Sequence, residues 1–110
     1  MRPYEVMVIF NADLEDQAIR DAVDRSLELI KGMGAEPGHI DYWGKRRLAY
    51  EINHKAEGYY VVMQAMSEPA AMAELHRTLS LSDDVIRHKV LRIPAEVYGP
   101  PRERATATKE

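Results

Sequence analysis

YYVVMQAM, residues 59–66, is the stretch of this sequence with the highest β-propensity. Its length and its apolar character predict a central strand of a sheet. Tyr59 and Tyr60 are adjacent in this strand, so they point to opposite faces and only one of them is expected in the core. The segments on either side decide which kind of sheet this strand belongs to.

The N-terminal part of the chain predicts a strand followed by a helix. VMVIF, residues 6–10, is a short apolar run that is typical of a buried strand. From residue 18 to residue 33, apolar side chains recur at intervals of three and four, which predicts an amphipathic helix. Asp13 is expected to cap the start of this helix, and Gly32 or Gly34 can take the left-handed conformation that ends it.

Residues 40–52 predict a second strand, in which Gly44 marks a bulge or bend. Alternate residues of a strand share a face, and the even-numbered positions carry the apolar and aromatic residues expected on a buried face: Ile40, Tyr42, Leu48, Tyr50 and Ile52. Arg46 falls on the same parity, so a simple alternation fails at that point.

The C-terminal part predicts a helix and a strand, and then a tail. SEP at residues 67–69 predicts the start of a second helix, with a proline in its first turn and His76 on its inward side, in or near the core, and SDD at residues 82–84 is expected to end it. Residues 85–93 predict the last strand. Residues 95–110 lack periodicity and predict a flexible tail.

The order strand, helix, strand, strand, helix, strand indicates an α+β fold. Two right-handed crossovers arrange these elements as a ferredoxin-like βαββαβ sandwich, with a four-stranded antiparallel sheet and two helices on one face. The first and third strands are expected in the middle and the second and fourth at the edges, with the other face of the sheet open. Residues 1–94 would form this single domain. Exposed edges invite pairing with another chain.

Composition excludes several classes of protein. The chain has no cysteine, which rules out disulfide scaffolds and thiolate metal sites. No apolar stretch is long enough to cross a bilayer, and residues 1–5 lack a signal-peptide core, so we expect a cytoplasmic protein without a membrane partner. The net charge of −3 argues weakly against nucleic-acid binding. The charge is sorted, however: residues 13–36 sum to −4, while residues 37–56 and 85–96 each sum to +2.

No constellation of catalytic residues is present, so we expect no enzyme, no small-molecule substrate, no cofactor and no metal. The four histidines are scattered without paired-ligand spacing. Asp83 and Asp84 are adjacent at a helix end, where a turn or capping role is the stronger interpretation. No glycine-rich loop opens a helix to cradle a phosphate.

Two basic clusters favour RNA contact. KRR, residues 45–47, stands beside Trp43, and the last strand carries Arg87, Lys89 and Arg92. Guanidinium groups bind phosphate oxygens, and both their planes and aromatic rings stack on bases. For each cluster, a charged edge strand that resists aggregation is an equally good interpretation.

Three motifs resemble the family of the sixth protein of the bacterial small ribosomal subunit. They are WGKRRLAY at residues 43–50, RPYE at residues 2–5, and DVIR at residues 84–87 continuing to residues 91–92. The resemblance covers residues 1–93. It implies a structural component of the ribosome that binds the central domain of 16S ribosomal RNA as a heterodimer with the eighteenth small-subunit protein.

The resemblance also implies contact residues, by position. The RNA candidates are Arg2, Arg46, Arg47, Arg87 and Arg92, to which Lys89 is added from its charge. The candidates for the protein partner are Trp43 and Tyr50, with the strand around them and the tail. Any of the strand arginines could serve either surface. The alternative function is a ferredoxin-like regulatory or ligand-binding domain that self-associates through its sheet edges.

Overall fold

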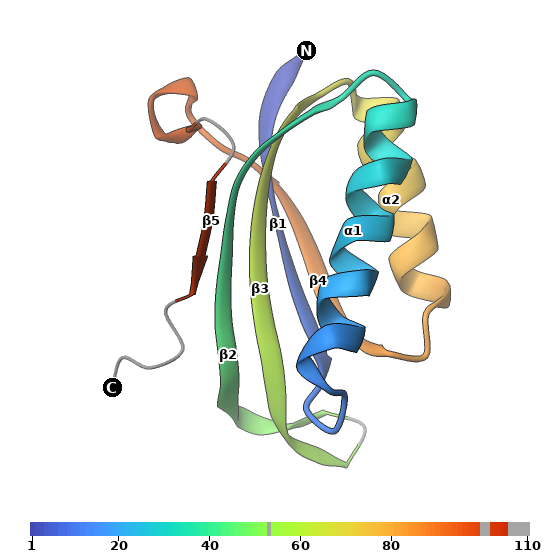
Figure 1. Ribbon diagram of the computed structural model, residues 1–110, viewed down its shortest axis with the longest axis vertical. Coiled ribbons are helices and arrows are strands. Elements are labelled where there is room, and N and C mark those ends of the chain that lie inside the picture. The colour runs from blue at the N-terminus through green and yellow to red at the C-terminus, as the bar shows by residue number, and fades with distance from the viewer. Residues whose placement is uncertain (53, 100–101, 106–110) are drawn as a thin grey trace.

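The computed structural model describes residues 1–52, 54–99 and 102–105 of the chain. Within these residues the elements are, in order, β1 (Arg2–Asn11), α1 (Asp16–Gly32), β2 (Glu36–Ile52), β3 (Lys55–Ser67), α2 (Pro69–Leu81), β4 (Val85–Arg92), the short 3-10 helix η1 (Ala95–Val97) and β5 (Arg102–Ala105). Both helices cover the same side of the sheet (Figure 1). The predicted four-stranded antiparallel sheet with two helices is confirmed, with β1 and β3 at its centre.

The core lies between the sheet and the helices, and strand alternation decides which residues enter it. On β1, Val6, Val8 and Phe10 are buried against the helices, because side chains two residues apart share a face. The helices contribute one apolar stripe each: Ile19, Val23 and Ile30 from α1, and Ala71, Met72, Leu75 and Leu79 from α2. Each helix therefore packs its apolar stripe against the same face of the sheet.

The start of α1 differs from the prediction. The N-cap residue is Glu15, and Asp13 lies before the helix, where its backbone N–H donates to Asn11 Oδ1 at 3.0 Å. Asn11 therefore forms the local turn that leads into the helix, and the helix begins at Asp16, two residues later than a cap at Asp13 would place it. Gly34, with φ +91°, takes the left-handed conformation expected just after α1.

The predicted bulge at Gly44 is confirmed and reverses the phase of β2. Gly44 has φ +86°, and the pairing of β2 with β3 shifts between Tyr42 and Gly44. One inserted residue moves every later side chain to the opposite face. The prediction of one buried parity along residues 40–52 is therefore wrong: Tyr42 packs in the core, whereas Leu48 and Tyr50 line a hollow on the far side of the sheet.

The outer edge of β2 is partly covered, which the sequence did not predict. β5 pairs with β2 in parallel over His39–Tyr42, so β2 is an edge strand only beyond that segment within the described residues. Figure 1 shows β5 beside β2, reached by a loop on the side of the sheet away from the helices.

Residues 95–99, which we name the docked segment, belong to the predicted tail but have several contacts with the sheet. Gln64 Nε2 donates to Val97 O at 3.0 Å, and Gly99 N donates to Gln64 Oε1 at 2.9 Å. The Tyr98 hydroxyl donates to Glu36 O at 3.0 Å. The rest of the predicted tail, residues 100–101 and 106–110, lies outside the described residues.

His76 is not on the inward side of α2, contrary to the prediction. It is exposed on the flank of the helix that faces β4, where it meets His88. Its neighbour Leu75 belongs to the inward stripe, whereas His76 lies beside that stripe, because successive helical residues are turned by about 100°. Within the described residues no helix is long and apolar enough to span a membrane.

Candidate nucleic-acid interface

The side of the sheet opposite the helices, here called the open face, carries cations and aromatic rings. Lys89 pairs with Met7 and Arg87 pairs with Ile9, so these four side chains share that face. On the other half of the sheet, Tyr60 of β3 points to the same side. The open face is therefore basic along β4 and carries an aromatic ring on β3.

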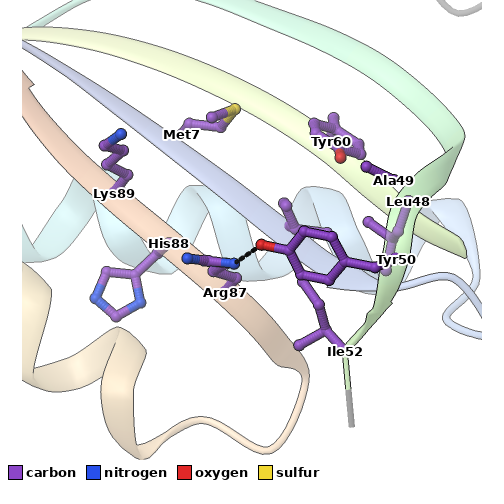
Figure 2. A pocket seen from close by; sticks show the side chains of 10 residues that line it. Met7, Leu48, Ala49, Tyr50, Ile52, Tyr60, Arg87, His88 and Lys89 are labelled. Carbon is purple, nitrogen blue, oxygen red and sulfur yellow. Dashed lines mark hydrogen bonds between the residues drawn. The ribbon is translucent and has the colours of Figure 1, made fainter. Parts of the chain in front are cut away.

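A hollow of about 430 Å³ lies in this face between β2 and β4 (Figure 2). Its lining combines an apolar floor with a basic rim: Met7, Ile9, Leu48, Ala49, Tyr50, Ile52, Tyr60, Arg87, His88 and Lys89. Figure 2 shows the Tyr50 ring reaching from β2 toward the guanidinium group of Arg87 on β4. The hollow is open to solvent and shallow enough for a partner to enter.

Tyr50 reaches β4 because the end of β2 departs from regular pairing. Arg47 pairs with Glu57 and Ile52 pairs with Lys55, so residues 48–51 face a single residue of β3. This irregular excursion displaces the strand over the open face. The Tyr50 hydroxyl accepts a long hydrogen bond of 3.4 Å from Arg87 Nη1, while the ring remains 65% exposed.

A second aromatic group lies on the same face beside the bulge. Trp43 and Tyr60 stack with ring centroids 6.1 Å apart and planes inclined by 13°. The Arg46 guanidinium lies 5.2 Å from the centre of the Trp43 ring. Such a contact holds a cation beside an aromatic plane, which suits a ligand that has both a flat ring and a phosphate.

The predicted RNA candidates divide into two groups. Arg46, Arg87 and Lys89 lie on the open face. The ion pairs found among the described residues use the carboxylates of Asp13, Glu28, Glu68 and Glu74, and none of them includes these three cations, so their charge is available to a ligand.

The other candidates are exposed but face the helix side of the sheet. Arg92 pairs with the buried Tyr4, and Arg2 pairs with the buried Ser67, at one end of the molecule. Arg47 points to the helix side at the opposite end of β2. These three arginines therefore cannot join the open-face cations on one flat surface.

The partner candidates Trp43 and Tyr50 are brought to the same face as the first group. The two surfaces that the sequence kept separate therefore meet, most directly where Tyr50 bonds Arg87. The sequence did not single out Met7 or Leu48 as floor residues. The signal was present in Gly44 and in the failed alternation at Arg46, since both indicate the change of phase.

Comparison with known proteins places the chain in a family. The model of the family described as "Ribosomal protein S6" matches residues 3–92. The small ribosomal subunit protein bS6 of Desulforamulus reducens is 46% identical over 92 residues, covering 84% of this chain and 97% of that protein. The bS6 protein of Saccharopolyspora erythraea is 42% identical over 109 residues, covering 99% of this chain and 92% of that protein.

A solved structure agrees. The crystal structure of 30S ribosomal protein S6 from Thermotoga maritima has a TM-score of 0.79 and 25% sequence identity, covering 84% of this chain and 87% of that chain. The relatives are ribosomal proteins rather than enzymes, which confirms the prediction that this chain is not an enzyme. By the extent of these matches, the chain belongs to the ribosomal protein S6 family.

Proposed function

We propose that this chain is a structural component of the small ribosomal subunit, and that it binds the central domain of 16S ribosomal RNA together with the eighteenth small-subunit protein. Membership of the S6 family supports the ribosomal role, because the relatives carry the name of the small subunit. The observation that carries the RNA contact is a set of three cations that have no ion-pair partner among the described residues and that share the open face with aromatic rings. The protein would then be located in the cytoplasm, within the ribosome.

The open-face cations suit a phosphate backbone more than a sequence-specific contact. Arg87 and Lys89 stand on one side of the hollow, and Arg46 stands across the sheet beside Trp43. Contacts of this kind position an RNA and carry little information about its bases. Arg2, Arg47 and Arg92 would then meet other segments of the RNA, or the protein partner, around the ends of the sheet.

The protein partner would lie along the part of β2 that β5 leaves uncovered. Beyond Tyr42 this strand has no paired neighbour on its outer side among the described residues. An uncovered edge offers main-chain hydrogen bonds to an added strand, and Trp43 and Tyr50 add side-chain contacts. Because the chain has a net charge of −3, a basic partner would also supply the positive field that the protein lacks alone.

A titration of a central-domain 16S RNA fragment tests this cooperation. The fragment is titrated with the protein alone, with the partner alone and with both. We expect weak binding by the protein alone and at least tenfold tighter binding with the partner. If about five basic side chains neutralise phosphates, the logarithm of affinity should fall with the logarithm of salt at a slope of about −4. Equal affinity with and without the partner would overturn the cooperative part.

Two further measurements separate the ribosomal role from the alternative of a self-associating domain. We expect the protein to co-sediment with small subunits and to leave them in a high-salt wash. Gel filtration of the purified chain is expected to give a monomer. A stable homodimer that does not bind RNA would count against the proposal. So would purified small subunits that are complete but lack this protein.

A further inference from the structure

Two histidines from different elements meet outside the open face. His76 lies on α2 and His88 on β4, and His88 Nε2 is 2.8 Å from His76 Nδ1. The ring centroids are 4.7 Å apart and the planes are inclined by 60°. These two nitrogens point at each other and are joined by a hydrogen bond, in which the donor depends on the tautomers of the two rings.

The fold brings these rings together. His88 pairs with the buried Val8 of β1, so its side chain points to the helix side of the sheet. His76 follows the buried Leu75 on α2 and stands on the flank of the helix nearest β4. His88 is half-buried and His76 is exposed, so the converging nitrogens are held on one side by the core and can be reached from solvent on the other.

The distance between the nitrogens is close to that of a chelate. Zinc–imidazole bonds are about 2.0–2.1 Å, so two ligands of a tetrahedral ion lie roughly 3.3 Å apart. A rotation of the exposed His76 side chain that moves its Nδ1 by a few tenths of an ångström opens the present 2.8 Å between Nδ1 and His88 Nε2 to that distance. The neighbouring cations Arg87 and Lys89 point to the open face, so the sheet separates their charge from these two nitrogens.

We propose that His76 and His88 form a binding site for a divalent transition-metal ion such as Zn²⁺, Ni²⁺ or Cu²⁺, with water in the remaining positions. Imidazole nitrogen is a preferred ligand of these ions. No group of three or more metal-ligating side chains occurs in the described part of the chain, so the site has two protein ligands and binds reversibly. The ion would connect the C-terminal half of α2 to the edge strand β4.

Thermal unfolding of the full chain tests the site. After treatment with a chelator, the protein is heated with increasing Ni²⁺ or Zn²⁺, and with Mg²⁺, which prefers oxygen ligands, as the control ion. We expect Ni²⁺ and Zn²⁺ to raise the melting temperature by several degrees and Mg²⁺ to leave it unchanged. His76→Gln and His88→Gln should remove the shift or weaken binding at least tenfold. The matched controls His39→Gln and His54→Gln should keep it.

Spectroscopy identifies the ligands directly. Substoichiometric Cu²⁺ is paramagnetic and should broaden the NMR signals of the His76 and His88 rings before those of His39 and His54. Calorimetry should give one ion per chain. Because His76 is exposed, His76→Gln is expected to fold normally and remains decisive if His88→Gln does not. An unchanged shift in His76→Gln, first broadening at the other histidines, or one ion per two chains would overturn the proposal.

Discussion

The two faces of one sheet differ in what covers them. On β1, Phe10 is 1% exposed beneath the helices, while its neighbours Met7 and Ile9 point to the other side and line the open hollow. Both faces are apolar at their centres. Only one is closed by the apolar stripes of α1 and α2, so the same residue types form a core on one face and the floor of a binding surface on the other.

Charge separates the faces as well. The outward side of α1 carries acidic residues, among them Asp21, Asp24 and Glu28, whereas the open face carries Arg87 and Lys89. An anionic ligand such as RNA is therefore repelled by one side of the molecule and attracted by the other. This difference explains how a chain of net charge −3 can present a basic surface.

The largest effect is expected where the covered face is broken. Phe10→Ala removes a fully buried ring and should lower the free energy of unfolding by about 3–5 kcal/mol. Tyr50→Ala, on the open face, removes an exposed ring and should change it by no more than about 0.5 kcal/mol. Chemical denaturation measures both variants, and a similar loss for each would show that the open face belongs to the core.

A close contact beneath the open face provides the next test. A Cβ at Gly58 would lie 2.3 Å from Ile9 Cγ2. Gly58→Ala must displace that side chain and should cost about 1–3 kcal/mol in chemical denaturation. Gly32→Ala is the matched control, because nothing lies within 4 Å of its Cβ at the end of α1. Equal stability of the two variants would show that Ile9 does not pack tightly against position 58.

Removing a positive charge should weaken RNA binding more on the open face than on the helix side of the sheet. Arg87→Ala is expected to weaken binding of the RNA fragment several-fold in the presence of the partner and to reduce the salt slope by about one phosphate contact. Arg25→Ala, an exposed arginine on α1, removes the same charge from the covered side and should have little effect. Filter binding at several salt concentrations measures both, and equal losses would mean that only net charge matters.

The smallest effect concerns the docked segment. Tyr98→Phe removes the hydrogen bond to Glu36 O and should cost about 0.5–1.5 kcal/mol. Burial, and then the nearby negative charge of Glu36, raise the pKa of the Tyr98 hydroxyl. A raised folded-state pKa means that this stability is present below the unfolded pKa of about 10 and is lost as pH rises through the folded pKa.

The pH dependence supplies the control for that variant. The difference in unfolding free energy between wild type and Tyr98→Phe should shrink as the pH rises above about 10, the unfolded pKa, and through the raised folded pKa, where the hydroxyl loses its proton. Other groups titrate in both proteins and cancel in the difference. A difference that stays constant over this range would show that the hydroxyl does not hold the segment.

Most of the fold could be predicted, and the open-face site only in part. Strand and helix positions follow local periodicity, which is why α2 lies where a helix was predicted, whereas β3 begins at Lys55, four residues before the predicted strand. The basic residues were also visible in the sequence. Their grouping was not, because it depends on which face each strand residue occupies, and Gly44 changes that face midway along β2.

The C-terminal segment was harder to predict for another reason. Residues 95–99 have no periodicity, and their order comes from contacts with residues far away in the sequence, such as Gln64 and Glu36. The same holds for the pair formed by His76 and His88, whose meeting depends on how α2 packs beside β4. Neither contact leaves a local signal.

Side-chain periodicity and short motifs are local properties, and they were enough to establish the order of elements, the two apolar helix stripes and the family. The tertiary structure decided which cations share a surface, how Tyr50 reaches Arg87 and what covers the edge of β2. The physical reason is register: pairing between distant strands assigns each side chain to a face, and a single inserted residue reverses that assignment.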